Sequence, residues 1–113
     1  MRYKLLGGTG LRGSELCLWA MIFGDARGSW GASKDEAARI LGAFAEAGGN
    51  FVDTANYYAN GESERILGGL VAPDRDRWVL VTKYGLSTRP GTLTAGVPTA
   101  RASLDPSTRA CVD

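Results

Sequence analysis

The 113-residue sequence contains no histidine. This absence excludes Ser-His-Asp and Cys-His catalysis, a histidine general base and histidine metal ligands. Only two cysteines occur, Cys17 and Cys111, too few for a four-thiolate metal site or a disulfide-rich scaffold. Thirteen basic residues against twelve acidic ones leave a net charge of +1, so no field of one sign is available to hold nucleic acid or anionic lipid. We expect no metal site, no nucleic-acid partner and no membrane partner.

Long apolar runs are also missing. None approaches the ~20 residues that span a bilayer, and the first eight residues lack the apolar core of a signal peptide. We therefore expect a cytoplasmic protein with reduced thiols, in which Cys17 packs as a small apolar side chain. A mass of 12.0 kDa leaves room for one small domain at most.

Two short extended runs stand near the start of the chain. Residues 3–6 and 15–21 have strand composition, and the glycine-rich turn 7–10 lies between them. This order suggests a hairpin that leads into a buried strand. Residues 25–31 are polar and rich in glycine, so we expect a loop there.

Helix and strand patterns then alternate. Ser33 and Glu36 form a capping box, and an apolar stripe after it predicts a helix that ends at Gly48-Gly49. The remaining expected elements are a strand over 50–54, a shorter helix over 62–70, a turn over 73–77 and a strand over 78–83. The last strand is almost entirely apolar, as in a parallel strand covered on both faces. The order β-α-β-α-β is typical of an α/β protein.

Three ionisable side chains stand at or just after the ends of predicted strands: Asp53, Tyr58 and Lys83. In a barrel of parallel strands the loops at the carboxyl ends converge, and reactive groups collect there. An ammonium close to a phenol favours the phenolate and lowers the phenol pKa from ~10, and a carboxylate beside the lysine keeps it charged and oriented. Such a tyrosine could deliver a proton near neutral pH.

Each of these residues also has a purely structural interpretation. Asp53 can cap a helix or form a salt bridge, Lys83 can be a solvated charge, and Tyr58 can be an amphipathic surface aromatic. Spacing alone leaves both interpretations open. The glycine-rich turn at 7–10 fits neither the dinucleotide fingerprint nor the P-loop, because the following helix and the Lys-Ser/Thr pair are missing.

Several motifs together resemble those of the aldo-keto reductases, in particular bacterial members with NADPH-dependent activity. The resemblance covers residues 1 to about 91. It rests on residues 3–7 with 9–11, on 18–24, on Phe-Val-Asp-Thr-Ala-Asn-Tyr-Tyr at 51–58, on Gly-Glu-Ser-Glu at 61–64 with Leu67-Gly68, and on Val-Thr-Lys at 81–83. The family fold is a (β/α)8 TIM barrel, of which this chain would hold the N-terminal hairpin and the first three βα units.

The resemblance also implies roles for individual residues. Tyr58 matches the family's proton donor, Lys83 the residue that lowers the pKa of that donor, and Asp53 the partner of the lysine. Asp53 also matches a position near the nicotinamide ribose, and Ala20 and Met21 match the segment that lines the nicotinamide pocket. The implied reaction is hydride transfer from NADPH to the carbon of a small aldehyde or ketone, with Tyr58 protonating the oxygen.

The chain departs from the family pattern in several places. Trp19 stands where glycine is usual, so we expect an indole to crowd the end of that strand, and Ile22 stands where threonine is usual. The family's catalytic histidine and its adenine and phosphate sites come later than this sequence reaches. We therefore expect an incomplete barrel that is inactive by itself.

Residues 92–113 have a different composition, without aromatic residues, Ile, Lys, Glu or Asn. This composition is typical of a loop or a disordered segment. In an offset reading frame, residues 98–104 can encode the family-like peptide His-Arg-Lys-Ser-Leu-Val. We therefore expect a frameshift near Pro90–Thr92 and a division into 1–91, the reductase part, and 92–113, a non-family tail. A genuine disordered tail is the alternative.

Two rival functions stay open, a non-catalytic interaction module and a non-functional truncated product. The carbonyl substrate, the choice of NADPH over NADH and the oligomeric state cannot be predicted from these residues.

Overall fold

The structure, a computed structural model, describes residues 1–24 and 31–83. The loop expected at 25–31 lies outside the described residues except for Gly31, and the tail expected at 92–113 lies outside them entirely.

An antiparallel hairpin opens the chain. β1 (Tyr3–Leu5) pairs with β2 (Arg12–Ser14). Gly7 and Gly10 in the turn have φ values of 56° and 79°, a left-handed conformation that glycine adopts without steric cost. A hairpin is present as predicted, but its second strand is Arg12–Ser14 and not part of the run 15–21, because pairing across the turn depends on backbone geometry more than on side-chain polarity. The strand that follows, expected to be buried, is exposed at Cys17 and Trp19.

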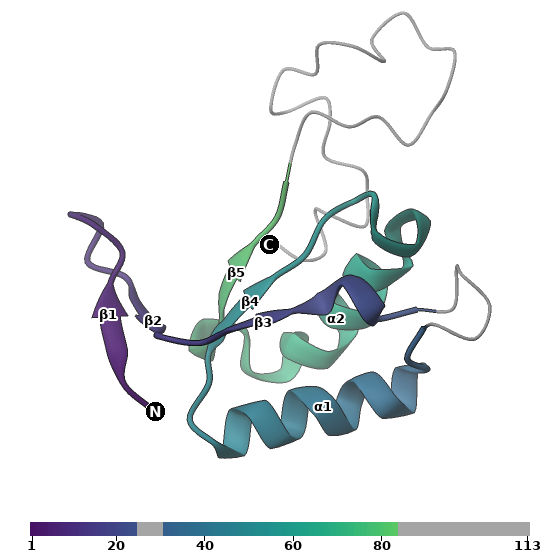
Figure 1. Cartoon of the computed structure of the whole chain (residues 1–113), viewed down its shortest axis with the longest axis horizontal. Coiled ribbons are helices and arrows are strands. Elements are labelled where there is room, and N and C mark those ends of the chain that lie inside the picture. Colours follow the sequence, from purple (N-terminus) through teal and green to yellow (C-terminus); the bar gives the residue numbers. More distant parts are fainter. Residues whose placement is uncertain (25–30, 84–113) are drawn as a thin grey trace, which may run out of the picture.

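Three parallel strands form the sheet at the centre of the molecule. They lie side by side in the order β3-β4-β5 (Figure 1), with bounds β3 (Cys17–Trp19), β4 (Phe51–Asp53) and β5 (Val79–Val81). The register places Trp19 beside Asp53 and Asp53 beside Val81. The carboxyl ends of all three strands therefore lie at one edge of the sheet.

Two α-helices connect these strands, α1 (Lys34–Glu46) and α2 (Glu62–Val71). The predicted capping box is confirmed, since the Glu36 N–H donates to the Ser33 hydroxyl and the Ser33 N–H donates to the Glu36 carboxylate at 2.8 Å. Short 3-10 turns follow β3, precede α2 and follow α2: η1 (Ala20–Ile22), η2 (Tyr58–Gly61) and η3 (Ala72–Arg77). The run 15–21 is thus extended only up to Trp19 and then turns.

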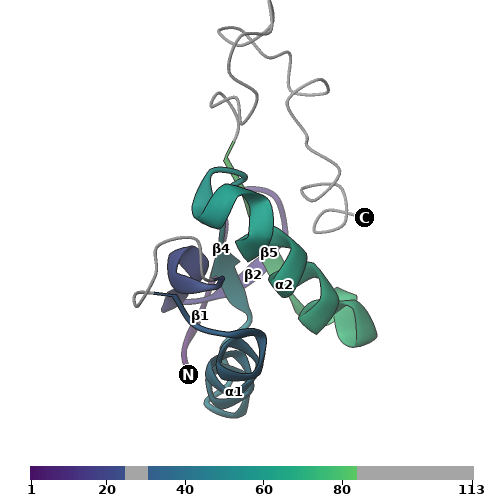
Figure 2. The same cartoon turned by 90° about the vertical axis from the view of Figure 1, so that its right-hand side faces the viewer.

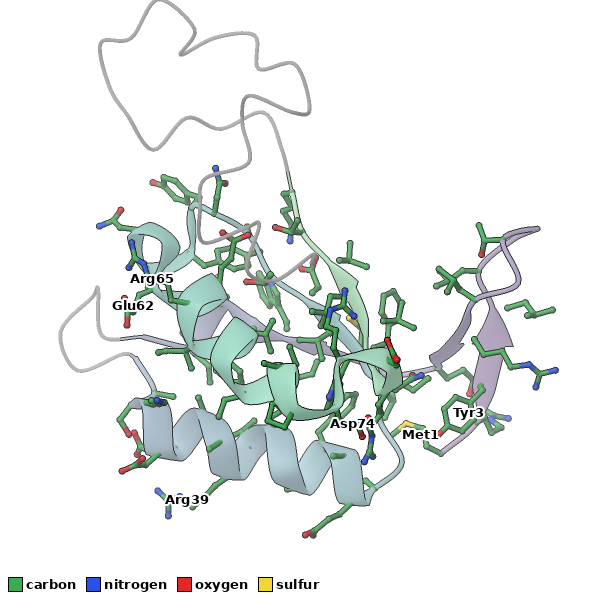
Figure 3. The ribbon with its side chains drawn as sticks, turned by 180° about the vertical axis from the view of Figure 1, so that it is seen from behind. Met1, Tyr3, Arg39, Glu62, Arg65 and Asp74 are labelled. Atoms are coloured by element: carbon green, nitrogen blue, oxygen red, sulfur yellow. The ribbon has the colours of Figure 1, made fainter. Side chains whose placement is uncertain are left out.

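Side chains of both helices join the buried core of the sheet, and in the view from behind α2 lies in front of the strands and α1 below them (Figure 3). The core is formed by fully buried apolar side chains from both layers, among them Ala37, Val52, Leu67 and Val71. In Figure 2, α1 lies below the strands and α2 runs beside them. The sequence prediction of an α/β fold is confirmed.

The opposite face of the sheet is open in the described part of the chain. Cys17, Trp19 and Val81 are exposed there, because alternate residues of a strand point to opposite faces and the helices cover only one. The predictions that Cys17 packs as an apolar side chain and that strand 78–83 is covered on both faces are therefore wrong for these residues. The described residues form three parallel strands and no closed barrel.

The hairpin is attached at the amino-terminal edge of the parallel sheet. The Ser14 N–H donates to Asn50 Oδ1 at 2.7 Å, and Asn50 Nδ2 donates to the Arg12 carbonyl at 3.0 Å. The Tyr3 hydroxyl donates to the Gly48 carbonyl just after α1, and Figure 3 shows Tyr3 next to this end of the helix. The opposite edge, where the strands end, is left for the site. Within residues 1–24 and 31–83, no helix has the length and apolar character needed to cross a membrane.

Candidate functional site

The carboxyl edge of the sheet brings Asp53 and Lys83 into direct contact. Lys83 Nζ lies 2.5 Å from Asp53 Oδ2 and donates also to the Thr54 carbonyl at 3.1 Å. Asp53 is the last residue of β4, and Lys83 follows the end of the neighbouring strand β5. Because parallel strands in register end at the same height, the two side chains meet although they are 30 residues apart in sequence.

Tyr58 joins this pair from the 3-10 turn η2. Lys83 Nζ lies over the phenol ring, 4.9 Å from its centre, a distance at which a cation is attracted to the face of an aromatic ring. The three residues that the sequence singled out for proton transfer are thus within one cluster. The salt bridge between Asp53 and Lys83 also fits the structural interpretation of Asp53, so the proton-transfer role of the cluster stays a prediction.

A fourth side chain, Trp19, contacts the tyrosine from β3. Its indole Nε1–H donates to the Tyr58 hydroxyl at 2.6 Å. The two ring centres are 6.1 Å apart with an angle of 70° between the planes, an edge-to-face geometry that aromatic pairs favour. The indole that was expected to crowd the strand end therefore binds the hydroxyl group.

The backbone directly after Tyr58 is unusual. Ala59 and Asn60 have φ values of 50° and 54°, in the left-handed region that costs a non-glycine residue about 1–2 kcal/mol. A side chain on Gly24 would place its Cβ only 3.0 Å from the Ala59 Cβ. The close approach of Gly24 and the strained turn hold η2 against the end of η1.

Buried hydroxyl groups tie the elements below the cluster together. Ser63 Oγ, in the first turn of α2, donates to the Ala20 carbonyl at 2.6 Å and lies 3.2 Å from Thr54 Oγ1. Thr54 and Ser63 have no exposed surface. One small network thus links the ends of β3 and β4 to the start of α2, and it holds Trp19 and Asp53 in register with the turn that carries Tyr58.

A buried carboxylate links α2 to β5. Glu64 is fully buried and accepts a hydrogen bond from Thr82 Oγ1 at 2.6 Å. Thr82 directly precedes Lys83, so this bond fixes the chain from which the lysine side chain extends. The nearby pair Glu62 and Arg65 on the same helix forms a surface ion pair at 2.7 Å (Figure 3), which at an exposed site contributes little.

The electrostatics of the cluster favour a charged lysine. Partial burial acts to lower the pKa of Lys83, but the hydrogen bonds to Asp53 and Tyr58, together with the negative charge of Asp53, outweigh it and raise the pKa. In the strand next to Asp53, Cys17 is exposed as a whole, but partial burial of its thiol and the negative charge of the Asp53 carboxylate raise the pKa of that thiol. The lysine is therefore an ammonium, and the thiol is protonated, at neutral pH.

The two remaining residues singled out in the sequence, Ala20 and Met21, lie in η1 at the end of β3. Ala20 is fully buried and supplies the carbonyl that Ser63 holds, whereas 36% of Met21 is exposed. Ala20 and Met21 thus flank the same edge as Asp53, but Ala20 offers no exposed surface of its own in the described structure.

Sequence reasoning missed the positive contribution of Trp19 and the network through Thr54 and Ser63. The only sequence signal for Trp19 was its departure from the family pattern. For Thr54 and Ser63 the signal was their place in two of the motifs that carried the resemblance.

The comparisons with known proteins agree on one family. The model of the family described as "Aldo/keto reductase family" matches residues 15–111. The match runs past residue 91, and the boundary between a reductase part and a tail stays a prediction.

Curated relatives carry matching names. The "Aldo-keto reductase ausK" of Emericella nidulans is 43% identical over 104 residues, which are 85% of this chain and 25% of that protein. The "Norsolorinic acid reductase stcV" of the same organism is 48% identical over 72% of this chain and 22% of that protein. The "Aryl-alcohol dehydrogenase [NADP(+)]" of Phanerodontia chrysosporium is 37% identical over 84% of this chain and 26% of that protein. The chain thus spans about a quarter of the length of these relatives.

Solved structures show the same relationship. The aldo-keto reductase PA4992 of Pseudomonas aeruginosa superposes with a TM-score of 0.76 at 33% identity, over 97% of this chain and 42% of that one. The aldo-keto reductase AKR11C1 of Bacillus halodurans superposes with a TM-score of 0.68 at 30% identity, over 82% of this chain and 29% of that one.

Proposed function

Because this chain belongs to the aldo/keto reductase family, we propose that it carries the proton-donor side of an NADPH-dependent carbonyl reductase site. The single observation that supports this most is the position of the Lys83 ammonium, 2.5 Å from the Asp53 carboxylate and 4.9 Å from the centre of the Tyr58 ring. A carboxylate, an ammonium and a phenol in this order are suited to moving one proton.

In the proposed reaction, Tyr58 donates its hydroxyl proton to the carbonyl oxygen of an aldehyde or ketone. A C–H bond forms at the carbonyl carbon and an O–H bond at the oxygen, so the product is an alcohol. Lys83 stabilises the phenolate that is left, and Asp53 holds the ammonium in place. Solvent then returns a proton to the phenolate.

The residues near this cluster fit a nicotinamide cofactor. NADPH, when bound, supplies the hydride. Asp53 presents a partly exposed carboxylate that can accept hydrogen bonds from ribose hydroxyls, and Met21 offers an exposed apolar surface beside it. Ala20 would contribute through its backbone, because its side chain is buried. The printed name of the Phanerodontia relative includes NADP(+), which supports NADPH for this chain.

We also propose that residues 1–113 alone do not catalyse the reduction. The three described strands leave one face of the sheet open, so a bound cofactor would be in contact with solvent on that side. We further propose that the protein is cytoplasmic.

The boundary at residue 91 is a separate proposal about the gene. If a frameshift lies near Pro90–Thr92, the nucleotide sequence read in the offset frame continues as barrel-like sequence through and beyond the codons for 92–113. An offset frame that soon reaches a stop codon would contradict it.

The activity is tested in a chimera. Residues 1–83 replace the corresponding segment of the Pseudomonas aeruginosa relative, and NADPH oxidation is followed with and without an aldehyde. We expect aldehyde-dependent oxidation in the chimera and none with residues 1–113 alone. Lys83→Met should reduce kcat about 100-fold or more with a smaller effect on the KM for NADPH. A folded chimera that binds NADPH but oxidises none would refute the proposed function.

A further inference from the structure

The Trp19 indole is the feature of this site that the proposed chemistry does not yet use. It comes from β3, whereas Asp53, Tyr58 and Lys83 come from β4, the turn η2 and the end of β5. Its contact with the Tyr58 hydroxyl joins two positions 39 residues apart. Since 54% of Trp19 is exposed, packing in the core does not explain why the ring lies there.

The chemistry of the indole determines the direction of this hydrogen bond. An indole N–H donates and cannot accept, so at 2.6 Å the Tyr58 oxygen must be the acceptor. The Lys83 ammonium, 4.9 Å from the centre of the phenol ring, also carries only donors. Among the described residues, the two groups that contact the tyrosine ring or hydroxyl in this cluster, Trp19 and Lys83, therefore supply hydrogen-bond donors, and the hydroxyl proton is left for an acceptor such as the substrate.

The Trp19 indole N–H acts on Tyr58 both as a hydroxyl and as a phenolate. Before transfer, it occupies a lone pair of the hydroxyl oxygen and so limits the directions in which the O–H bond can point. After transfer, the indole N–H faces a phenolate oxygen, and hydrogen bonds to charged groups are stronger than those between neutral ones. The edge-to-face ring packing keeps the indole in this orientation.

Building on the proposed function, we propose that Trp19 is a positioning residue for the proton donor. It holds the Tyr58 oxygen as an acceptor, so that the hydroxyl proton is directed to the carbonyl oxygen of the substrate, and it stabilises the phenolate together with Lys83. The indole acts through Tyr58 and need not touch the substrate.

Two spectroscopic signatures in the full chain test this inference without requiring turnover. The first is the NMR signal of the Trp19 indole N–H, assigned by its loss in Trp19→Phe. In Tyr58→Phe this signal should shift, and its exchange with solvent should become about fivefold faster, because one net hydrogen bond is lost. In the matched control Tyr57→Phe, which removes an exposed neighbouring hydroxyl, both should stay unchanged.

The second signature is the Raman Fermi doublet of tyrosine, whose intensity ratio distinguishes a hydroxyl that accepts from one that donates. The contribution of Tyr58 is the difference between the wild type and Tyr58→Phe. We expect the intensity ratio of a hydroxyl that accepts a hydrogen bond. Trp19→Phe should remove this ratio. In that variant the contribution of Tyr58 is the difference between the spectra of Trp19→Phe and of the double variant that also carries Tyr58→Phe.

An indole signal that is the same in wild type and Tyr58→Phe would overturn the inference. So would a Tyr58 doublet that Trp19→Phe leaves unchanged. These results are independent of the chimera, whose turnover decides the proposed function. An inactive chimera together with both signatures would therefore remove the reductase proposal and leave the hydrogen bond established.

Discussion

The buried serine beneath the site offers the sharpest quantitative prediction. Ser63→Ala removes a hydroxyl that donates to the Ala20 carbonyl at 2.6 Å and lies 3.2 Å from the Thr54 hydroxyl. Ser63 and Thr54 are completely buried, so water cannot replace the lost partner. A buried polar group left unsatisfied costs ~1–3 kcal/mol, and we expect the free energy of unfolding to fall by about 2 kcal/mol.

A double-mutant cycle with Thr54→Val separates this network from general damage. Thr54→Val alone should cost about 1 kcal/mol, since it removes only the longer of the two contacts. The double variant should lose less than the sum of the single variants, with a coupling energy of about 0.5–1 kcal/mol.

The assay for the cycle is urea unfolding followed by far-UV circular dichroism, with thermal melting as a second probe. A loss of about 2 kcal/mol corresponds to roughly 8–16 °C in Tm for a domain of this size. If Ser63→Ala unfolds within ~0.5 kcal/mol of the wild type, the network does not hold the strand ends together and the reasoning fails.

Three further predictions concern stability. Leu67→Ala should cost about 2–5 kcal/mol in urea unfolding, because Leu67 has no exposed surface and the substitution leaves a cavity; a loss below ~1 kcal/mol would contradict the core described here. Gly24→Ala should destabilise, since Gly24 has a φ of 104° and a new Cβ would lie 3.0 Å from that of Ala59. In the matched variant Gly42→Ala in α1, the new Cβ has no heavy atom within 4 Å, and the substitution should stabilise the protein by about 0.5–1 kcal/mol. Equal changes in the free energy of unfolding for Gly24→Ala and Gly42→Ala would refute this prediction. The pKa of Lys83 is raised above its usual 10.5, so its stabilising effect is complete below that pH and is lost as pH rises through the higher folded-state pKa. Wild type should therefore exceed Lys83→Met in stability at about pH 9, by less than ~1 kcal/mol because the side chain is 47% exposed. This advantage should shrink as the pH rises beyond 10.5, and a difference that grows with pH would contradict the sign.

Local signals were enough to predict the elements that depend on neighbouring residues. The helix α1 was predicted from its capping box and apolar stripe because both act within a few residues of the chain. Asp53 and Lys83 were placed at strand ends because the apolar runs before them end there. Their meeting followed from the geometry of parallel strands.

Features set by tertiary contacts were not predictable in the same way. The strand Arg12–Ser14 has no alternating pattern, and its pairing depends on the turn that precedes it. The exposed position of Cys17 depends on which face of the sheet the helices cover. Ala59 adopts a positive φ without a glycine signal, and the bond between Trp19 and Tyr58 depends on the packing of that turn.

The comparison of two adjacent tyrosines tests the central claim most directly. In the chimera, with saturating NADPH and aldehyde, Tyr58→Phe should lower kcat about 100- to 10,000-fold, which is the contribution of a positioned general acid. Tyr57→Phe, the same substitution one residue earlier on an exposed side chain, should leave kcat within about twofold of the wild type. Equal rates for Tyr58→Phe and the unsubstituted chimera would contradict the assignment of Tyr58 as the proton donor.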